Sequence, residues 1–276
     1  MDKNPLPELG PADDVLIASM GVMTRGSPAM FARRRRILHE ARRLMVEAGV
    51  EGMAMRELAI RSGVSSRTLY NAFGSKEALI AAAVRQYYDK FLRALSDDRD
   101  VYTFDWVLSG IVATNLRNQQ LRDYLSVLVG QYFATSADDA IRVELRRIAA
   151  GFIVPWLEVA EARRQLRRGT DIAQSVSHIA SLQYAMNQEW LAGYIPDDAF
   201  VPTVLRGVLT YLAGFVRGVA LEPIEALLLD LNGPSKQVTG IIAVEAARIR
   251  AILDSASGLW PADRTAIARD QTEPGT

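Results

Sequence analysis

The chain lacks most of the residue types on which catalysis and metal binding depend. It contains no cysteine, which excludes disulfides and thiolate zinc sites, and it has only two histidines. His39 and His178 fall in different predicted domains, and a lone helical histidine is more often a structural hydrogen-bond partner than a base. No Gly-rich phosphate loop, nucleophile elbow or His-Glu-x-x-His signature occurs. We therefore expect no enzymatic activity, catalytic residue, metal or cofactor.

Long apolar runs are also missing. No unbroken run approaches the roughly 18–20 residues that a membrane-spanning helix needs, and the first residues lack the apolar core of a signal peptide. We expect a soluble, cytoplasmic protein without a membrane partner. Residues 1–32 are rich in proline and glycine and are expected to form a flexible N-terminal arm, and residues 257–276 a C-terminal tail.

Charge is balanced over the whole chain but not along it. The chain has 32 Lys and Arg against 32 Asp and Glu. Twelve of the basic and six of the acidic residues lie between Arg33 and Lys90, which leaves twenty against twenty-six elsewhere. A basic head on an acidic body is what DNA binding by one end of a molecule requires.

Four consecutive arginines, residues 33–36, open the first predicted helix. Cations are unfavourable at a helix N-terminus, where the dipole prefers anions. Either they form a solvated face, or at least one of them contacts DNA phosphates, as an extended basic arm can do.

Residues 56–77 carry the most specific pattern, a helix-turn-helix that runs into a further helix. Gly63 falls where the first helix must stop, because only glycine enters the left-handed conformation without a steric cost. Ser65 can cap the next helix, and Leu69 and Phe73 form its inner face. Gly74 marks a second stop. The short turn leaves outward side chains that can donate hydrogen bonds to phosphates or base edges, namely Ser66, Arg67, Tyr70 and Asn71.

This run resembles the signature of the TetR (tetracycline repressor) family. Between Gly63 and Leu79 the elements Gly-Val-Ser, Thr-Leu-Tyr, Phe and Lys-Glu-x-Leu occur at the family's spacing, and only the leading Ala is replaced, by Ser62. The resemblance implies helices over residues 34–49, 55–62, 66–72 and 76–92, within a DNA-binding domain over residues 33–92. The DNA contacts it suggests are Arg56, Ser65, Ser66, Arg67, Thr68, Tyr70, Asn71 and Lys76.

Two positions depart from the family pattern. Ala54 stands where Thr usually caps the second helix, so Glu57 lacks its capping-box partner. Losing such a cap costs about 1 kcal/mol, unless another group satisfies the free N–H groups. Many relatives have a small residue in place of Arg67, which can add either a guanine contact or another phosphate contact. The resemblance assigns the phosphates to Tyr70 and Lys76, and the bases to Ser66, Arg67 and Asn71.

Beyond residue 92 every long segment has a helical period, so we expect an all-α fold. Residues 93–256 would form a larger helical domain for ligand binding and dimerisation. The predicted helices are 103–118, 120–134, 138–168 with an interruption near Gly151 and Pro155, 171–193, 201–221, 223–231 and 237–256.

Residues 201–221 carry Gly207, Tyr211, Gly214 and Gly218 at helical spacing beside an apolar stripe. Each glycine costs about 0.5–1 kcal/mol relative to alanine in a helix, which indicates that another backbone approaches closely. That backbone belongs either to the same subunit or to a second copy. In TetR relatives the last two core helices build a four-helix dimer bundle, so we favour a homodimer interface here, with residues 171–193 as the partner helix.

Aromatic and neutral polar side chains are interleaved over the body, either as core or as the walls of a small-molecule cavity. Relatives of this family use the body as an inducer pocket. Residues 172–188 contain no charged side chain, so a pocket there would suit a neutral, largely apolar ligand. The best-placed candidates are Trp106, Tyr132, Trp156, Asn187 and Trp190.

A cluster of arginines, Arg163, Arg164, Arg167 and Arg168, precedes Gly169. This pattern is typical of a helix C-terminus with favourable cations and a glycine stop. Contact with an anionic ligand or with DNA is the alternative.

Together these features predict a dimeric repressor that binds a palindromic operator in double-stranded DNA. A small-molecule effector would release it by favouring a spacing of the recognition helices that no longer fits the operator. The alternative is an interaction protein that keeps the fold but has lost operator binding. The basic outer face formed by Arg67, Tyr70 and Lys76 speaks against that alternative.

Overall fold

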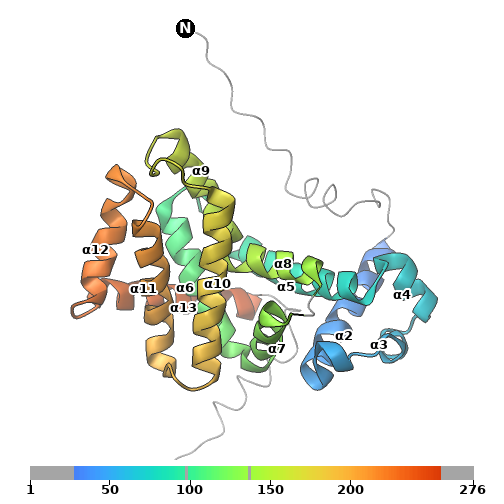
Figure 1. Ribbon diagram of the computed structural model, residues 1–276. Helices are drawn as coiled ribbons and strands as arrows, with labels where there is room; N and C mark the ends of the chain where they lie inside the picture. The colour runs from blue at the N-terminus through green and yellow to red at the C-terminus, as the bar shows by residue number, and fades with distance from the viewer. Residues whose placement is uncertain (1–27, 97–98, 136–137, 256–276) are drawn as a thin grey trace, which may run out of the picture.

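The computed structural model describes residues 28–96, 99–135 and 138–255, and these ranges contain helices and no β-strand. The predicted all-α class is confirmed. A head of three helices lies beside a larger body (Figure 1). The head consists of α2 (Pro28–Gly52), α3 (Met55–Ser62) and α4 (Ser66–Phe73), and α5 (Lys76–Ser96) runs from it into the body.

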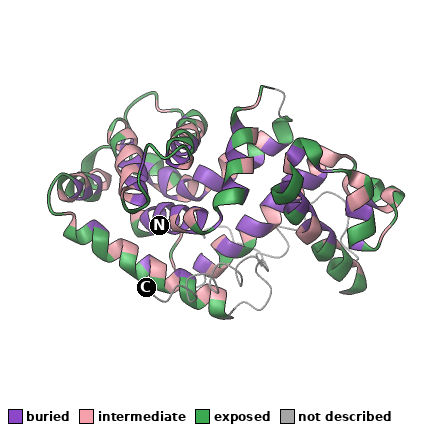
Figure 2. Ribbon diagram, turned by 90° about the horizontal axis from the view of Figure 1, so that it is seen from below, coloured by how far each residue is buried: buried purple, intermediate pink, exposed green. Residues whose placement is uncertain are grey.

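The body contains eight labelled α-helices within the described ranges. They are α6 (Phe104–Gln120), α7 (Arg122–Phe133), α8 (Asp139–Ala150), α9 (Val154–Ala162), α10 (Ile172–Leu191), α11 (Asp197–Ala213), α12 (Glu222–Leu231) and α13 (Lys236–Ser255), with short 3₁₀ turns η1 (Gly151–Ile153) and η2 (Gly218–Ala220). Buried residues concentrate where helices face one another (Figure 2). None of the described helices is long and apolar enough to cross a bilayer.

The junction of head and body involves several helix pairs. α5 packs along α2 on one side and α8 on the other, while α7 touches α2 directly. α8 also packs against α10, so it lies between the linking helix and the centre of the body (Figure 1). α8 therefore contacts both the helix that carries the head and a central helix of the body.

The predicted boundaries hold best in the head. α3 matches residues 55–62, and α4 ends one residue beyond the predicted 66–72. α2 begins at Pro28, inside the predicted arm, because proline suits the first turn of a helix, where its missing N–H would have no partner. Residues 1–27 and the tail over 257–276 lie outside the described residues.

Two predicted helices of the body are too long. Helix 138–168 ends at Ala162, where Arg164 takes the left-handed conformation (φ 57°) and Gln165 N–H donates to Ala160 O, so the arginine cluster continues into a loop and Gly169 is not its stop. Helix 201–221 ends at Ala213. The physical reason is a pairing between distant segments of the chain. Leu166 and Val216 form an antiparallel bridge, and the backbone of each segment is not helical there.

Candidate nucleic-acid interface

The turn between α3 and α4 is built by the residues that the sequence singled out. Gly63 is left-handed (φ 63°) and its N–H donates to the last carbonyls of α3. Ser65 is the N-cap of α4, with its Oγ accepting from Thr68 N at 3.1 Å. Leu58 and Leu69 are fully buried between the two helices. These contacts fix α4 across α3 with its other face in solvent.

The outer face of α4 carries unpaired polar groups. Arg67, Tyr70 and Asn71 are exposed, as is Arg56 on α3. Among the described residues, none of these four side chains has a hydrogen-bond or ion-pair partner. Long donors that project from a rigid helix without a protein partner can bind phosphates and base edges at little cost.

The other predicted DNA contacts lie on the same surface but have partners within the protein. The hydroxyls of Ser65 and Thr68 lie 2.9 Å apart, and Lys76 Nζ donates to the carbonyl of Glu51 at 3.1 Å. Ser66 is half-buried at the start of α4. The side chain of Lys76 therefore adjoins the end of α2.

The missing cap of α3 is confirmed, because Ala54 makes no side-chain hydrogen bond there. Glu57, the expected capping-box acid, accepts instead from Arg61 Nε at 2.8 Å, and Arg61 also pairs with Glu47 on α2 at 2.6 Å. The i, i+4 spacing of Glu57 and Arg61 could have predicted this pair.

The arginine run divides into two kinds. Arg33 and Arg35 are exposed, and no described residue pairs with their side chains. Arg34 and Arg36 reach back to the backbone of the helix-turn-helix, at Ala72 O and Ser62 O. Burial, aided by the nearby charge of Arg85, lowers the pKa of Arg34. Nothing local in the sequence marks this division, since each partner is more than twenty residues away.

The five predicted ligand-binding residues are all buried in the body and already have protein neighbours. Trp190 stacks on Phe200 with ring centroids 4.6 Å apart, and Tyr132 stacks on Tyr184 at 4.3 Å. Trp156 contacts the Phe104 ring, Trp106 is 4% exposed, and Asn187 donates to Gln183 O at 2.7 Å. The structure does not bring these five side chains together around one described cavity.

A neutral polar network runs through the interior between α5, α6, α8 and α10. Burial raises the pKa of Tyr88, whose hydroxyl donates to Asn118 Oδ1 at 3.1 Å. Asn115 Nδ2 donates to Gln183 Oε1 at 3.1 Å, and Gln183 Nε2 donates to the α8 carbonyl of Ala149 at 2.6 Å. These amides connect three helices of the body through uncharged groups.

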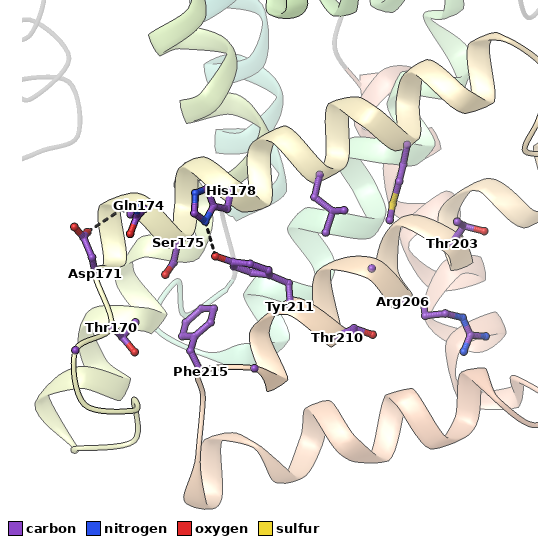
Figure 3. A pocket seen from close by; sticks show the side chains of 15 residues that line it. Thr170, Asp171, Gln174, Ser175, His178, Thr203, Arg206, Thr210, Tyr211 and Phe215 are labelled. Carbon is purple, nitrogen blue, oxygen red and sulfur yellow. Dashed lines mark hydrogen bonds between the residues drawn. The ribbon is translucent and has the colours of Figure 1, made fainter.

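An open groove of about 830 Å³ lies on the other side of α10, between it and α11, with α12 along its lower edge in the view of Figure 3. His178 Nδ1 and Tyr211 Oη lie 2.9 Å apart across the two helices. Gly207 and Gly214 also line it, whereas Gly218 lies outside, in η2. None of the five predicted ligand residues contributes to this groove.

For Gly207 the structure supports the alternative of close packing within one subunit, which the sequence analysis had not favoured. A Cβ added to Gly207 would lie 2.1 Å from Met186 Cε of the same chain, so α10 accounts for this glycine. Gly214 follows the last residue of α11, and Gly218 has φ 63° in a turn. The four residues therefore do not share one continuous helical face.

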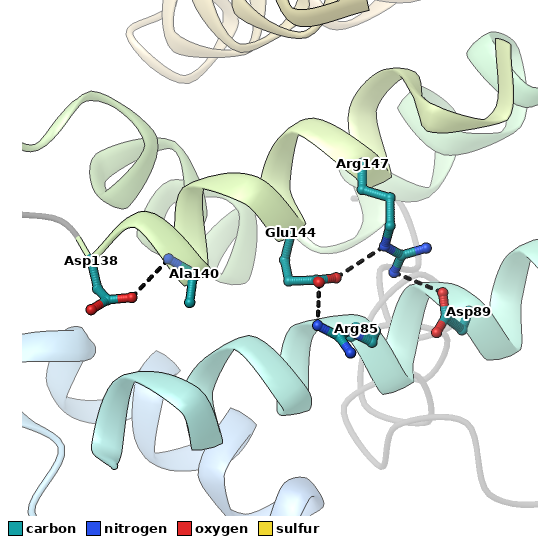
Figure 4. A network of polar contacts seen from close by, with 6 residues as sticks. All are labelled: Arg85, Asp89, Asp138, Ala140, Glu144 and Arg147. Carbon is teal, nitrogen blue, oxygen red and sulfur yellow. Dashed lines mark hydrogen bonds and ion pairs between the residues drawn. The ribbon is translucent and has the colours of Figure 1, made fainter. Parts of the chain in front are cut away.

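Ion pairs connect the linking helix with the body (Figure 4). Glu144 on α8 is buried and pairs with Arg85 on α5 and with Arg147 at 3.0 Å, and Arg147 reaches Asp89 on α5 at 2.8 Å. The sequence analysis did not single out these residues, because the pairing depends on how α5 and α8 pack.

Comparison with known proteins agrees with this geometry. Residues 37–83 match the family model of bacterial regulatory proteins of the tetR family. The HTH-type transcriptional repressor AcnR of Corynebacterium efficiens is 29% identical over 146 residues, which are 47% of this chain and 72% of that protein.

Solved structures show the same fold. A TetR-family transcriptional regulator from Rhodococcus sp. superposes with a TM-score of 0.50 at 17% identity, over 63% of this chain and 95% of that one. The TetR regulator tylp from Streptomyces fradiae also gives 0.50, at 20% identity, over 71% and 92%. In residues 37–83 the chain is therefore similar to bacterial regulatory proteins of the tetR family, and its fold is the one that solved TetR-family regulators share.

Proposed function

We propose that two copies of this chain bind an inverted repeat as a repressor and that a small, neutral, largely apolar molecule releases them. The observation that carries the proposal is the outer face of α4, where Arg67, Tyr70 and Asn71 are exposed. Ser66, Arg67 and Asn71 would contact base edges, while Tyr70 and Lys76 would contact phosphates.

We infer a dimer from the short length of α4, the helix that would contact the bases. α4 has eight residues, and one such helix reads too few base pairs to be specific alone. The groove between α10 and α11 offers a surface for the second copy, with Leu182, Met186 and Phe215 partly exposed. Its one cation, Arg206, already donates to Asn232 Oδ1 and Leu231 O. Asp171, its one carboxylate, accepts from Gln174 N, so a copy could cover this face with both charged groups already hydrogen bonded.

The ligand would bind inside the body, next to the interface. Asn115 is 1% exposed and its Oδ1 accepts no hydrogen bond from the described residues, nor do the buried hydroxyls of Ser109 and Thr114 have partners there. An unsatisfied buried polar group costs about 1–3 kcal/mol, so a small neutral donor between α6 and α10 would gain by pairing with Asn115. Asn187 and Trp190 lie farther along α10.

Release would pass through α8. A ligand that separates α6 from α10 would displace α8, which packs on α10 and is joined to α5 by the ion pairs of Glu144. Because α5 carries the head, the two α4 helices of a dimer would change their spacing, and the ligand would stabilise the state that fits the operator less well.

Selection of bound fragments from randomised duplex DNA by the purified full chain tests the DNA part. We expect an inverted repeat whose half-site centres lie about one helical turn apart. Enrichment of no sequence would overturn the proposal and favour the interaction protein.

Tryptophan fluorescence titrations with and without the selected operator test the ligand part, using a library of neutral aromatic compounds. Coupling is reciprocal, so operator DNA should weaken a true effector by typically 5–150-fold. Asn115→Leu should abolish this binding, whereas a ligand of equal affinity in both titrations would be no effector.

A further inference from the structure

We propose that Arg34 and Arg36 are positioning residues that hold the two helices of the helix-turn-helix by their C-terminal ends and so set the orientation of α4 on DNA. This inference rests on the proposed function for its operator readout. It separates the arginine run into two residues that hydrogen bond to the helix-turn-helix, Arg34 and Arg36, and two exposed residues without a described partner, Arg33 and Arg35, which can reach phosphates.

Arg34 makes two contacts with the end of α4. Its Nη1 donates to Ala72 O at 3.4 Å, and its Cζ lies 4.4 Å from the centroid of the Phe73 ring. Ala72 and Phe73 are the last two residues of α4, whose final carbonyls have no partner within the helix. A guanidinium there is favoured both by the helix dipole and by the face of the aromatic ring.

Arg36 makes the equivalent contact with α3. Its Nε donates to Ser62 O at 2.9 Å, and Ser62 is the fully buried last residue of α3. This helix lacks a side-chain cap at its other end, Ala54. The cation from α2 therefore stabilises α3 at the terminus opposite the missing cap, and both helices are tied to α2 at the same kind of position.

α3 and α4 are short, so their stability depends on tertiary contacts such as those of Arg34 and Arg36. α3 and α4 have eight residues each, and helices shorter than about 12–15 residues are marginal without tertiary contacts. The N-terminal end of α4 is fixed by Ser65, so the Arg34 contact determines whether its other end, with Tyr70 and Asn71, is also fixed. Base readout depends on that orientation, whereas attraction to phosphates does not.

Arg34→Met tests the proposal, because methionine keeps an unbranched apolar stem and removes the guanidinium. Arg35→Met is the matched control on the next, exposed position. Each variant is titrated with the selected operator and with a random duplex over a range of salt concentrations. Loss of a positioning residue should weaken operator binding alone, whereas loss of a phosphate contact should weaken binding to both duplexes and reduce the salt slope.

For Arg34→Met we expect about fivefold weaker operator binding, which corresponds to about 1 kcal/mol, with unchanged affinity for random duplex and an unchanged salt slope. For Arg35→Met we expect both affinities to fall together and the salt slope to decrease by about 1. Arg34→Lys should recover part of the loss, because lysine keeps the cation over Phe73. Equal losses on both duplexes in Arg34→Met, with or without a smaller slope, would overturn the proposal.

Amide hydrogen exchange tests the same contact without DNA. The amides of Leu69 to Gly74 should exchange several times faster in Arg34→Met than in the wild type or in Arg35→Met. Unchanged exchange would overturn the positioning role, even if operator binding is specific. A wild type that lacks operator preference but shows this exchange pattern would instead overturn only the proposed function.

Discussion

In the head, the polar side chains of α4 project into solvent, whereas in the body comparable amides and hydroxyls are buried against one another. Arg67 and Asn71 are exposed and lack described partners, while Asn115 and Gln183 are 1% and 2% exposed and hydrogen bonded to each other. The difference teaches that polarity alone does not mark a site. The DNA contacts that we propose at Arg67 and Asn71 are exposed groups without described partners, whereas the ligand contact that we propose at Asn115 is a buried group with incomplete hydrogen bonding.

The largest expected effect is on the stability of the body. Trp190 is 2% exposed and stacked on Phe200, so Trp190→Ala should lower the free energy of unfolding by about 3–5 kcal/mol in denaturant titrations. Tyr194→Ala is the control, because Tyr194 is 83% exposed and its loss should change stability by less than about 0.5 kcal/mol. Equal effects of the two changes would contradict the assignment of Trp190 to the core.

A glycine pair sharpens the same comparison within the body. A Cβ on Gly110 of α6 would lie 2.5 Å from the ring of Phe152, so Gly110→Ala should cost about 1–3 kcal/mol of stability through overpacking. Gly130 on α7 has nothing within 4 Å of such a Cβ, and Gly130→Ala should gain about 0.5–1 kcal/mol. Thermal and denaturant unfolding measure both. A neutral Gly110→Ala would show that Phe152 moves aside.

In the head, we expect a substitution on α4 to change the free energy of operator binding by a similar amount. The same substitution should leave the free energy of unfolding nearly unchanged. Arg67 is exposed on α4, and Arg67→Ala should cost about 1–3 kcal/mol at one base position of each half-site. Binding to a panel of operators with single base changes measures it. A uniform loss over the whole panel would reassign Arg67 to a phosphate.

Lys76→Ala should have the smallest effect. Its Nζ adjoins the carbonyl of Glu51, and we expect its removal to weaken operator and random duplex alike and to reduce the salt slope by about 1. Titrations at several salt concentrations measure the slope. An unchanged slope would mean that Lys76 stays with α2 in the complex.

The sequence predicted the head well because its determinants are local. Gly63 and Ser65 end one helix and start the next within three residues, so the bounds of α3 are matched and those of α4 differ by one residue. The end of α11 could not be predicted from local sequence signals. It depends on the bridge between Leu166 and Val216, which are fifty residues apart in sequence.

The candidate sites show the same division. Leu69 is buried, and Arg67 lies two residues before it on the same helix. The helical period therefore places Arg67 on the outer face. The partner of Arg34 is a carbonyl 38 residues away, so the sequence offered only phosphate contact or solvation for the arginine run and did not predict this hydrogen bond. The arrangement of the body's aromatic residues likewise depends on the crossing of helices, which periodicity does not specify.

The most direct test of the account is the affinity of the full chain for the selected inverted repeat, compared with the same duplex after one half-site is scrambled and after both are. If two outward α4 faces read the DNA as a dimer, the intact repeat should bind at least about a thousandfold more tightly than the fully scrambled duplex, with two copies per DNA and an intermediate affinity for the half-scrambled one. Equal affinity for all three duplexes would contradict the account.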